Sequence, residues 1–140
     1  MNEQVEHSIQ WLVKGDHDLG TAKITFMHIP EFSDTVAFHC QQALEKYLKA
    51  YLIASSIPFK YTHDLVYLLE LIISEDLDFK KYYEICLELQ GYAVEIRYPD
   101  GMVFPSEELI EQAIKDAKDF RDFVCLKLGI TVKYNPIMDA

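Results

Sequence analysis

The sequence predicts a single all-α domain, on the strength of three observations. Apolar residues recur every three to four positions along nearly the whole chain, which is the period of a helix buried on one side. No segment alternates apolar and polar residues for long enough to found a sheet. The 140 residues, half of them hydrophobic, suffice for one core without disulfides or metal. We therefore expect an antiparallel up-and-down four-helix bundle with one additional short helix over residues 1–130, followed by an irregular C-terminal tail over 131–140.

Capping residues, proline and glycine divide this pattern into helices. We expect them over residues 3–28, 34–55, 63–73, 78–96 and 107–128. Ser33, Thr62 and Ser106 offer side-chain oxygens as N-caps for the second, third and fifth helices. Pro30 ends the first helix because it cannot continue one, and Gly129 suits the left-handed position that follows a helix end.

Composition limits the partners of the chain. The formal net charge is -10, so the bulk charge of the protein repels phosphates. RNA binding is disfavoured for this reason, and any nucleotide contact requires a local basic cluster. The segment MNEQVEHSIQWLV lacks the positive and apolar regions of a signal peptide, and no apolar run approaches the ~20 residues that span a membrane.

The three cysteines, Cys40, Cys86 and Cys125, lie within apolar helical patterns and form no CxxC motif. This arrangement predicts buried, reduced thiols rather than a metal site. Together with the missing signal peptide, it favours a cytoplasmic location.

The second helix carries a polar stripe beside its apolar face. At about 100° per residue, His39, Gln42, Lys46 and Lys49 fall within an arc of about 80°. This stripe offers ammonium groups for a phosphate, and an amide and an imidazole for a base or ribose. The alternative is an ordinary solvated face on which Glu45 pairs with Lys49 at i,i+4.

A second candidate is the segment EIRYPDG, where Arg97 and Tyr98 lie at the end of a helix. Arg97 offers a planar guanidinium for a phosphate, and Tyr98 offers an aromatic face for a base. The alternative is that Arg97 only stabilises the negative end of the helix dipole.

The remaining polar clusters are weaker candidates. His63 and Asp64 precede the third helix, where Asp64 suits a capping role and His63 is by default a turn residue. Asp16 and Asp18 flank His17, but neighbouring helical residues point about 100° apart and cannot clasp one ion. We therefore predict no metal site.

Several segments together resemble the HEPN family. They are Trp11, the pair Asp18–Leu19 with Ala22, the segment FHCQQALEKYLKAYL (Phe38 to Leu52), HDL (His63 to Leu65) and RYPD (Arg97 to Asp100). The resemblance extends from about residue 10 to residue 128, and the long segment followed by HDL is its most specific part. It implies a bundle of four to five helices, usually dimeric, that binds nucleotides and acts with a small nucleotidyltransferase, often as a toxin–antitoxin-like pair.

Other members of the family that the chain resembles are metal-independent ribonucleases. Their signature is an Arg followed by four to six residues and a His, paired across a dimer. Counted from Arg97, the three permitted positions hold Met102, Val103 and Phe104, and none of the five histidines follows Arg97. The group that would transfer a proton or stabilise an oxyanion is therefore missing from its usual place.

Our leading interpretation is a nucleotide-binding partner module rather than an enzyme acting alone. In this interpretation Lys46 and Lys49 bind phosphate, and Arg97 binds either phosphate or a carboxylate of the partner protein. Base or ribose contacts come from His39, Gln42 and Tyr98. The ligand is ATP-like, and Mg²⁺ enters only through the partner enzyme. The alternatives are a ribonuclease with a non-standard site around Arg97 and His39, and a purely structural dimerisation scaffold, which the nine tyrosines of the chain favour.

Overall fold

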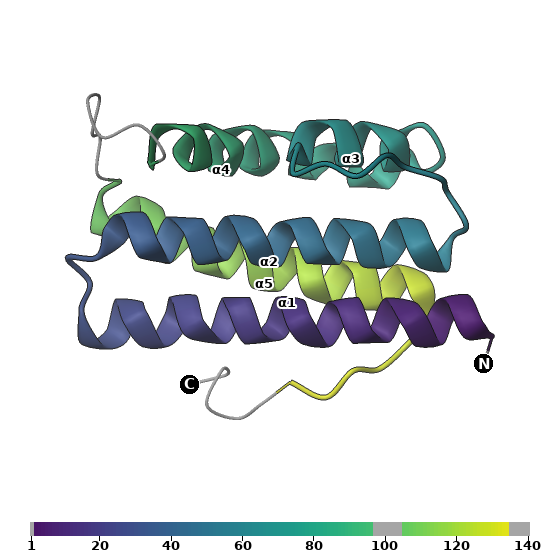
Figure 1. Ribbon diagram of the computed structural model, residues 1–140, viewed down its shortest axis with the longest axis horizontal. Helices are drawn as coiled ribbons and strands as arrows, with labels where there is room; N and C mark the ends of the chain where they lie inside the picture. The colour runs from purple at the N-terminus through teal and green to yellow at the C-terminus, as the bar shows by residue number, and fades with distance from the viewer. Residues whose placement is uncertain (1, 97–104, 135–140) are drawn as a thin grey trace.

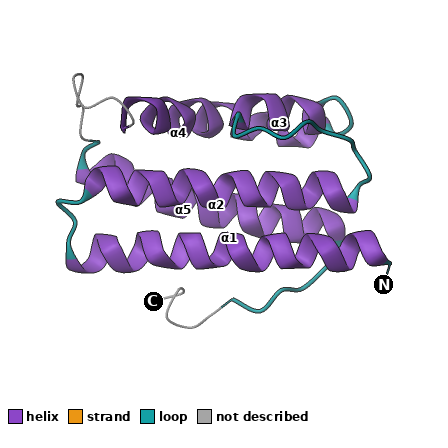
Figure 2. Cartoon of the chain, viewed as in Figure 1, coloured by secondary structure: helices purple, strands orange, loops and turns teal. Residues whose placement is uncertain are grey.

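The computed structural model describes residues 2–96 and 105–134 of the chain (Figure 1). Five α-helices occur in these ranges: α1 (Glu3–His28), α2 (Ser33–Ala54), α3 (Leu65–Ile73), α4 (Tyr83–Ile96) and α5 (Glu107–Leu128). A 3₁₀ helix, η1 (Leu77–Tyr82), precedes α4. The described residues contain no strand, which confirms the expected all-α class (Figure 2). None of these helices is long and apolar enough to cross a bilayer.

Helix α2 is the centre of the molecule. It contacts α1, α3, α4 and α5, so it is packed against every other α-helix of the described residues. In Figure 1, α1 and α2 form an antiparallel pair with α5 behind them, and α3 and α4 share a second row on the far side of α2. That second row consists of short elements rather than one long helix. The up-and-down four-helix arrangement therefore stays a prediction.

Two of the three predicted N-caps are wrong. Phe32 occupies the N-cap position of α2 without a side-chain hydrogen bond, and Ser33 is already the first helical residue. Asp64, not Thr62, caps α3, because its carboxylate accepts a hydrogen bond from the backbone N–H of Tyr67 at 3.0 Å. The Thr62 hydroxyl instead accepts from the backbone N–H of Asp64 at 3.1 Å.

The caps of α5 are confirmed. The Ser106 hydroxyl accepts from the backbone N–H of Leu109 at 3.2 Å, and Gly129 adopts a left-handed conformation with φ of 64°.

The single helix predicted over residues 78–96 is wrong at its start. Asp76 accepts a hydrogen bond from the backbone N–H of Asp78, and the chain then winds as the 3₁₀ helix η1 before α4 begins. Residues three apart eclipse each other in a 3₁₀ helix, so Phe79 and Tyr82 both point into the core, where they are buried.

The apolar face of α2 provides much of the core. Periodicity predicts seven residues on this face; Tyr51 is only partly buried, and the other six are fully buried: Val36, Cys40, Ala43, Leu44, Tyr47 and Leu48. All three cysteines are buried and unbridged, which confirms the expected reduced thiols. Burial raises the pKa of the Cys40 and Cys86 thiols to about 12 each, so both stay protonated near neutral pH.

Helices α1 and α2 approach each other closely at Gly15. A Cβ atom at this position would lie 2.5 Å from Cε1 of Tyr47, closer than non-bonded carbon atoms can come. The absent side chain leaves room for the Tyr47 ring beside α1, where the Tyr47 hydroxyl reaches the next residue, Asp16.

Asp16, Tyr47 and Arg121 form an enclosed cluster that joins three helices. Asp16 accepts a hydrogen bond from the Tyr47 hydroxyl at 2.7 Å and two from Arg121, at 2.8 Å and 3.1 Å. All three residues are buried. Burial alone would lower the pKa of Arg121, but its hydrogen bonds to Asp16 and Asp122, together with the charge of Asp16, outweigh that effect and raise it.

The same guanidinium anchors the chain after α5. Arg121 Nη2 donates to the backbone carbonyl of Val132 at 2.7 Å, and the ring of Tyr134 lies 4.7 Å from the guanidinium carbon. Residues 130–134 contain no helix and are held against the bundle by these contacts.

Candidate functional site

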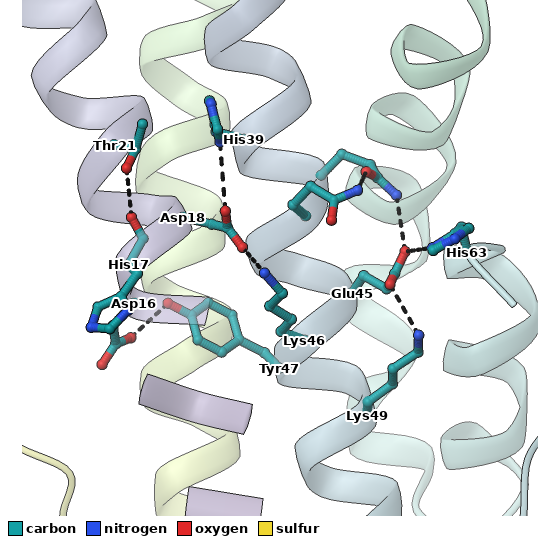
Figure 3. A network of polar contacts seen from close by, with 12 residues as sticks. Asp16, His17, Asp18, Thr21, His39, Glu45, Lys46, Tyr47, Lys49 and His63 are labelled. Carbon is teal, nitrogen blue, oxygen red and sulfur yellow. Dashed lines mark hydrogen bonds and ion pairs between the residues drawn. The ribbon is translucent and has the colours of Figure 1, made fainter. Parts of the chain in front are cut away.

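The polar stripe predicted on α2 lies between α1 on one side and His63 on the other (Figure 3). Its four members do not converge on one point. The structure places His39 and Lys46 in one cluster and Lys49 in another, and each cluster combines a carboxylate, an ammonium group and an imidazole. We call them the α1-side cluster (Asp18, His39 and Lys46) and the loop-side cluster (Gln41, Glu45, Lys49 and His63).

The α1-side cluster is partly open to solvent. Lys46 Nζ donates to the carboxylate of Asp18, and 24% of the Lys46 side chain is exposed. His39 Nδ1 lies 3.5 Å from the same carboxylate and makes no hydrogen bond, although this atom is buried. Lys46 thus has a carboxylate partner yet keeps a solvent-exposed surface.

The loop-side cluster is built around a buried carboxylate. Glu45 accepts from Lys49 Nζ at 3.0 Å and lies 2.9 Å from Nδ1 of His63 (Figure 3). Gln41 Nε2 donates to the same carboxylate at 3.5 Å. The side chains of Glu45 and Lys49 are each only 4% exposed, whereas that of His63 is 47% exposed.

Gln42 connects to this cluster indirectly. Its amide nitrogen donates to the side-chain oxygen of Gln41 at 3.0 Å, and the residue is half-buried. Gln42 therefore extends the hydrogen-bond chain of the loop-side cluster toward the surface.

Aromatic rings enclose the buried ammonium group of Lys49. Its Nζ lies 5.7 Å from the centre of the Trp11 ring and 5.2 Å from that of Tyr61. The indole nitrogen of Trp11 in turn donates to His7 at 3.3 Å. The predicted phosphate role of Lys49 would therefore require the Glu45 pair to open. The alternative Glu45–Lys49 pair exists, but it is buried rather than solvated.

The charges of the two clusters balance locally. Two lysines oppose two carboxylates, so with neutral imidazoles the four charges sum to zero in a chain of net charge -10. The opening between α4 and α5 differs, since it is lined by one lysine and by Glu84, Glu88, Asp116 and Asp119. The α2 face thus repels a phosphate less than that acidic side does.

The remaining candidates from the sequence are Arg97, Tyr98, Asp16 and Asp18. Arg97 and Tyr98 lie outside the described residues, so their roles stay predictions. Asp16 and Asp18 bind Arg121 and Lys46 respectively, so the two carboxylates face different partners. No group of three metal-ligating side chains gathers anywhere in the ranges that the structure covers.

Sequence reasoning missed Gln41 and Tyr61 as members of the site. Gln41 precedes Glu45 and Lys49 at i+4 and i+8 spacing, which is a signal that the three share one face of a helix. No spacing rule links them to His63 or Tyr61, because both belong to a loop whose path depends on tertiary packing.

Fold and site together define an all-helical domain whose central helix carries two charge-balanced clusters on one face. The chain belongs to the HEPN family, since the family model described as the HEPN domain matches residues 9–128. Comparison with curated proteins and with solved structures gave no match. The match to the family model confirms the resemblance inferred from the sequence. At the family level, the chain is a nucleotide-related or ribonuclease-type module, of a family often paired with nucleotidyltransferases.

Proposed function

We propose that this chain is a homodimeric, cytoplasmic HEPN module that binds an ATP-like nucleotide and acts with a nucleotidyltransferase, as one half of a toxin–antitoxin-like pair. The observation that carries the proposal is the charge-balanced polar face of α2, in a protein whose overall charge would otherwise repel a phosphate. Mg²⁺ would enter with the partner enzyme.

Lys46 is the phosphate-binding residue of this proposal. Its ammonium group has three donors, is partly exposed and has Asp18 as its only carboxylate partner within the described residues. A phosphate can engage its exposed side without taking apart a buried pair. Arg97 would add a second cation, and His39, Gln42 and Tyr98 would contact the base or ribose.

Lys49 has a different role from the one that its position in the stripe predicts. Because it is buried against Glu45 and two aromatic rings, we assign it to fixing the Glu45 carboxylate rather than to binding phosphate. The loop-side cluster then forms a rigid edge of the site.

Nucleotide titration with matched variants tests the site. The protein is titrated with ATP, ADP, AMP and GTP, with and without Mg²⁺, and its melting temperature is followed. Ligand at a hundred times its Kd adds about 2.7 kcal/mol, which raises the melting temperature by several degrees. We expect Lys46→Ala to weaken binding about tenfold, as loss of a charged hydrogen bond does.

Lys115→Ala is the matched control, because Lys115 is a lysine of α5 that is 67% exposed and pairs only with Glu111 in the described residues. Equal binding by Lys46→Ala and Lys115→Ala would remove Lys46 from the site. A wild-type protein with no shift at millimolar nucleotide would contradict nucleotide binding and favour the structural scaffold.

Mass in solution tests the dimer. Light scattering on the eluting protein should give twice the 16.3 kDa of one chain. A monomeric mass at micromolar concentration would contradict the homodimer.

The ribonuclease alternative rests on membership of the family alone. None of the five histidines follows Arg97 in the sequence. Intact RNA after incubation with purified protein, with no difference from Arg97→Ala, would exclude it.

A further inference from the structure

His63 forms the open edge of the loop-side cluster, and its surroundings fix which ring nitrogen faces outward. Nδ1 lies 2.9 Å from Glu45. Glu45 is paired with the Lys49 ammonium at 3.0 Å, so it is a carboxylate, which only accepts hydrogen bonds. The hydrogen on the neutral imidazole must therefore be on Nδ1, which leaves Nε2 with a lone pair.

This lone pair has no partner within the described residues. The Nδ1 edge of the ring faces the buried Glu45, and 47% of the His63 side chain is exposed to solvent. Nε2 is thus an oriented hydrogen-bond acceptor at the protein surface. A ligand group placed against it must donate a hydrogen, as a hydroxyl does. A phosphate, which offers only acceptors, would set one lone pair against another.

Tyr61 places an aromatic surface next to this acceptor. The Tyr61 and His63 rings are 5.5 Å apart at an angle of 75°, and the Lys49 ammonium lies 5.2 Å from the Tyr61 ring. Tyr61 is nevertheless 84% exposed. An exposed tyrosine ring with contacts that orient it is the kind of surface on which a nucleotide base stacks.

The buried Glu45–Lys49 pair also needs an explanation other than stability. Removing two charges from water costs about as much as their attraction returns, so apolar residues of the same size often serve a fold equally well. What the pair supplies here is an anionic acceptor, fixed in place, that sets the orientation and tautomer of His63.

We propose that Nε2 of His63 accepts a hydrogen bond from a ribose hydroxyl of the bound nucleotide, while the base stacks on Tyr61. The module then selects ribonucleotides over their deoxy analogues. This inference rests on the proposed nucleotide binding and names the ligand class of that site. Glu45 acts as a positioning residue through His63.

The test compares ATP, 2′-deoxy-ATP and 3′-deoxy-ATP by calorimetric titration of the full chain. We expect wild-type protein to bind ATP about tenfold more tightly than the analogue that lacks the contacted hydroxyl. His63→Phe keeps a ring of similar size without an acceptor, so it should bind ATP and both analogues equally. His28→Phe, at an exposed histidine at the end of α1, is the matched control and should discriminate like the wild type.

A second readout is the tautomer itself. Nitrogen-15 NMR of neutral His63 should show the hydrogen on Nδ1. In Glu45→Gln the new amide can donate to Nδ1, which would move the hydrogen to Nε2 and abolish the preference for ATP.

The outcomes separate the two proposals. If wild-type protein binds no nucleotide, the proposed function fails and this inference fails with it. If ATP and both analogues bind equally to wild type, or if His63→Phe still discriminates, only the His63 inference is overturned. A hydrogen on Nε2 in the wild type overturns it as well.

Discussion

Two buried carboxylates of this molecule have similar surroundings but different roles. Asp16 and Glu45 are both almost fully buried, and each is paired with a buried cation, Arg121 and Lys49 respectively. The enclosed cluster around Asp16 takes its partners from α2 and α5, and all of them are buried. The loop-side cluster instead ends at a histidine that is half in solvent.

This difference separates a structural role from a functional one. The enclosed cluster uses its polar contacts to join helices and to hold the segment after α5, so it leaves no group for a ligand. The loop-side cluster draws its cation from the same helix as its carboxylate, at i,i+4, so the pair joins no two helices. Its contacts orient His63 instead. Breaking the enclosed cluster should therefore lower the free energy of unfolding more than replacing the Glu45–Lys49 pair does.

The largest effect should come from Arg121→Met. This change removes the cation and leaves Asp16 buried without it, which typically costs about 3–5 kcal/mol. Urea denaturation followed by circular dichroism measures the loss. Lys115→Met, an exposed change on the same helix, should cost less than about 0.5 kcal/mol. A loss below about 1 kcal/mol for Arg121→Met would mean that the enclosed cluster does not hold the helices together.

The second-largest effect should come from alkaline pH, which weakens the enclosed cluster. Burial, and then the charge of Asp16, raise the pKa of Tyr47 above its usual value of 10.0. The folded state therefore keeps a proton that the unfolded chain releases, so this contribution to stability is intact below about pH 10 and declines above it. Each further pH unit costs up to about 1.4 kcal/mol.

Tyr47→Phe isolates this contribution. Between pH 10 and pH 11 the free energy of unfolding of this variant should decline less steeply than that of the wild type. Urea denaturation at each pH measures it for both proteins. The decline that remains should include Cys40, whose pKa is raised by burial from 9.0 to about 12. Parallel curves for the two proteins would show that Tyr47 does not keep its proton.

The smallest effect should come from the double variant Glu45→Leu with Lys49→Met. Apolar side chains of similar size replace the whole pair, so stability should stay within about 1 kcal/mol of the wild type. Either single change should cost more, because it leaves one buried charge without its partner. A loss above about 3 kcal/mol for the double variant would give the loop-side cluster the structural role that we assign to the enclosed one.

Local signals in the sequence predict both ends of α5 but not the N-caps of α2 and α3. Ser106 and Gly129 delimit α5 as expected, because capping is a contact within one turn. The predicted start of α4 is wrong because periodicity does not distinguish the two kinds of helix there. Over the six residues of η1, the periods of a 3₁₀ helix and an α-helix place the same apolar residues inward.

The site could be predicted only in part, because its partners are distant in the chain. Periodicity places His39, Lys46 and Lys49 on one face of α2, and the structure agrees. It cannot tell that Asp18 pairs with Lys46 or that Trp11 helps to enclose Lys49, since both contacts depend on how α1 packs. Burial of a lysine is a tertiary property with no signature in its own helix.

The bond between Arg121 and Asp16 has a consequence for folding kinetics. These residues are 105 positions apart, whereas Tyr47 is 31 positions from Asp16. The shorter loop costs less entropy to close, so we expect the α1–α2 hairpin to form before α5 docks. We therefore expect the bond between Arg121 and Asp16 to form after the rate-limiting barrier of folding. Its loss would chiefly hasten unfolding and leave the refolding rate nearly unchanged.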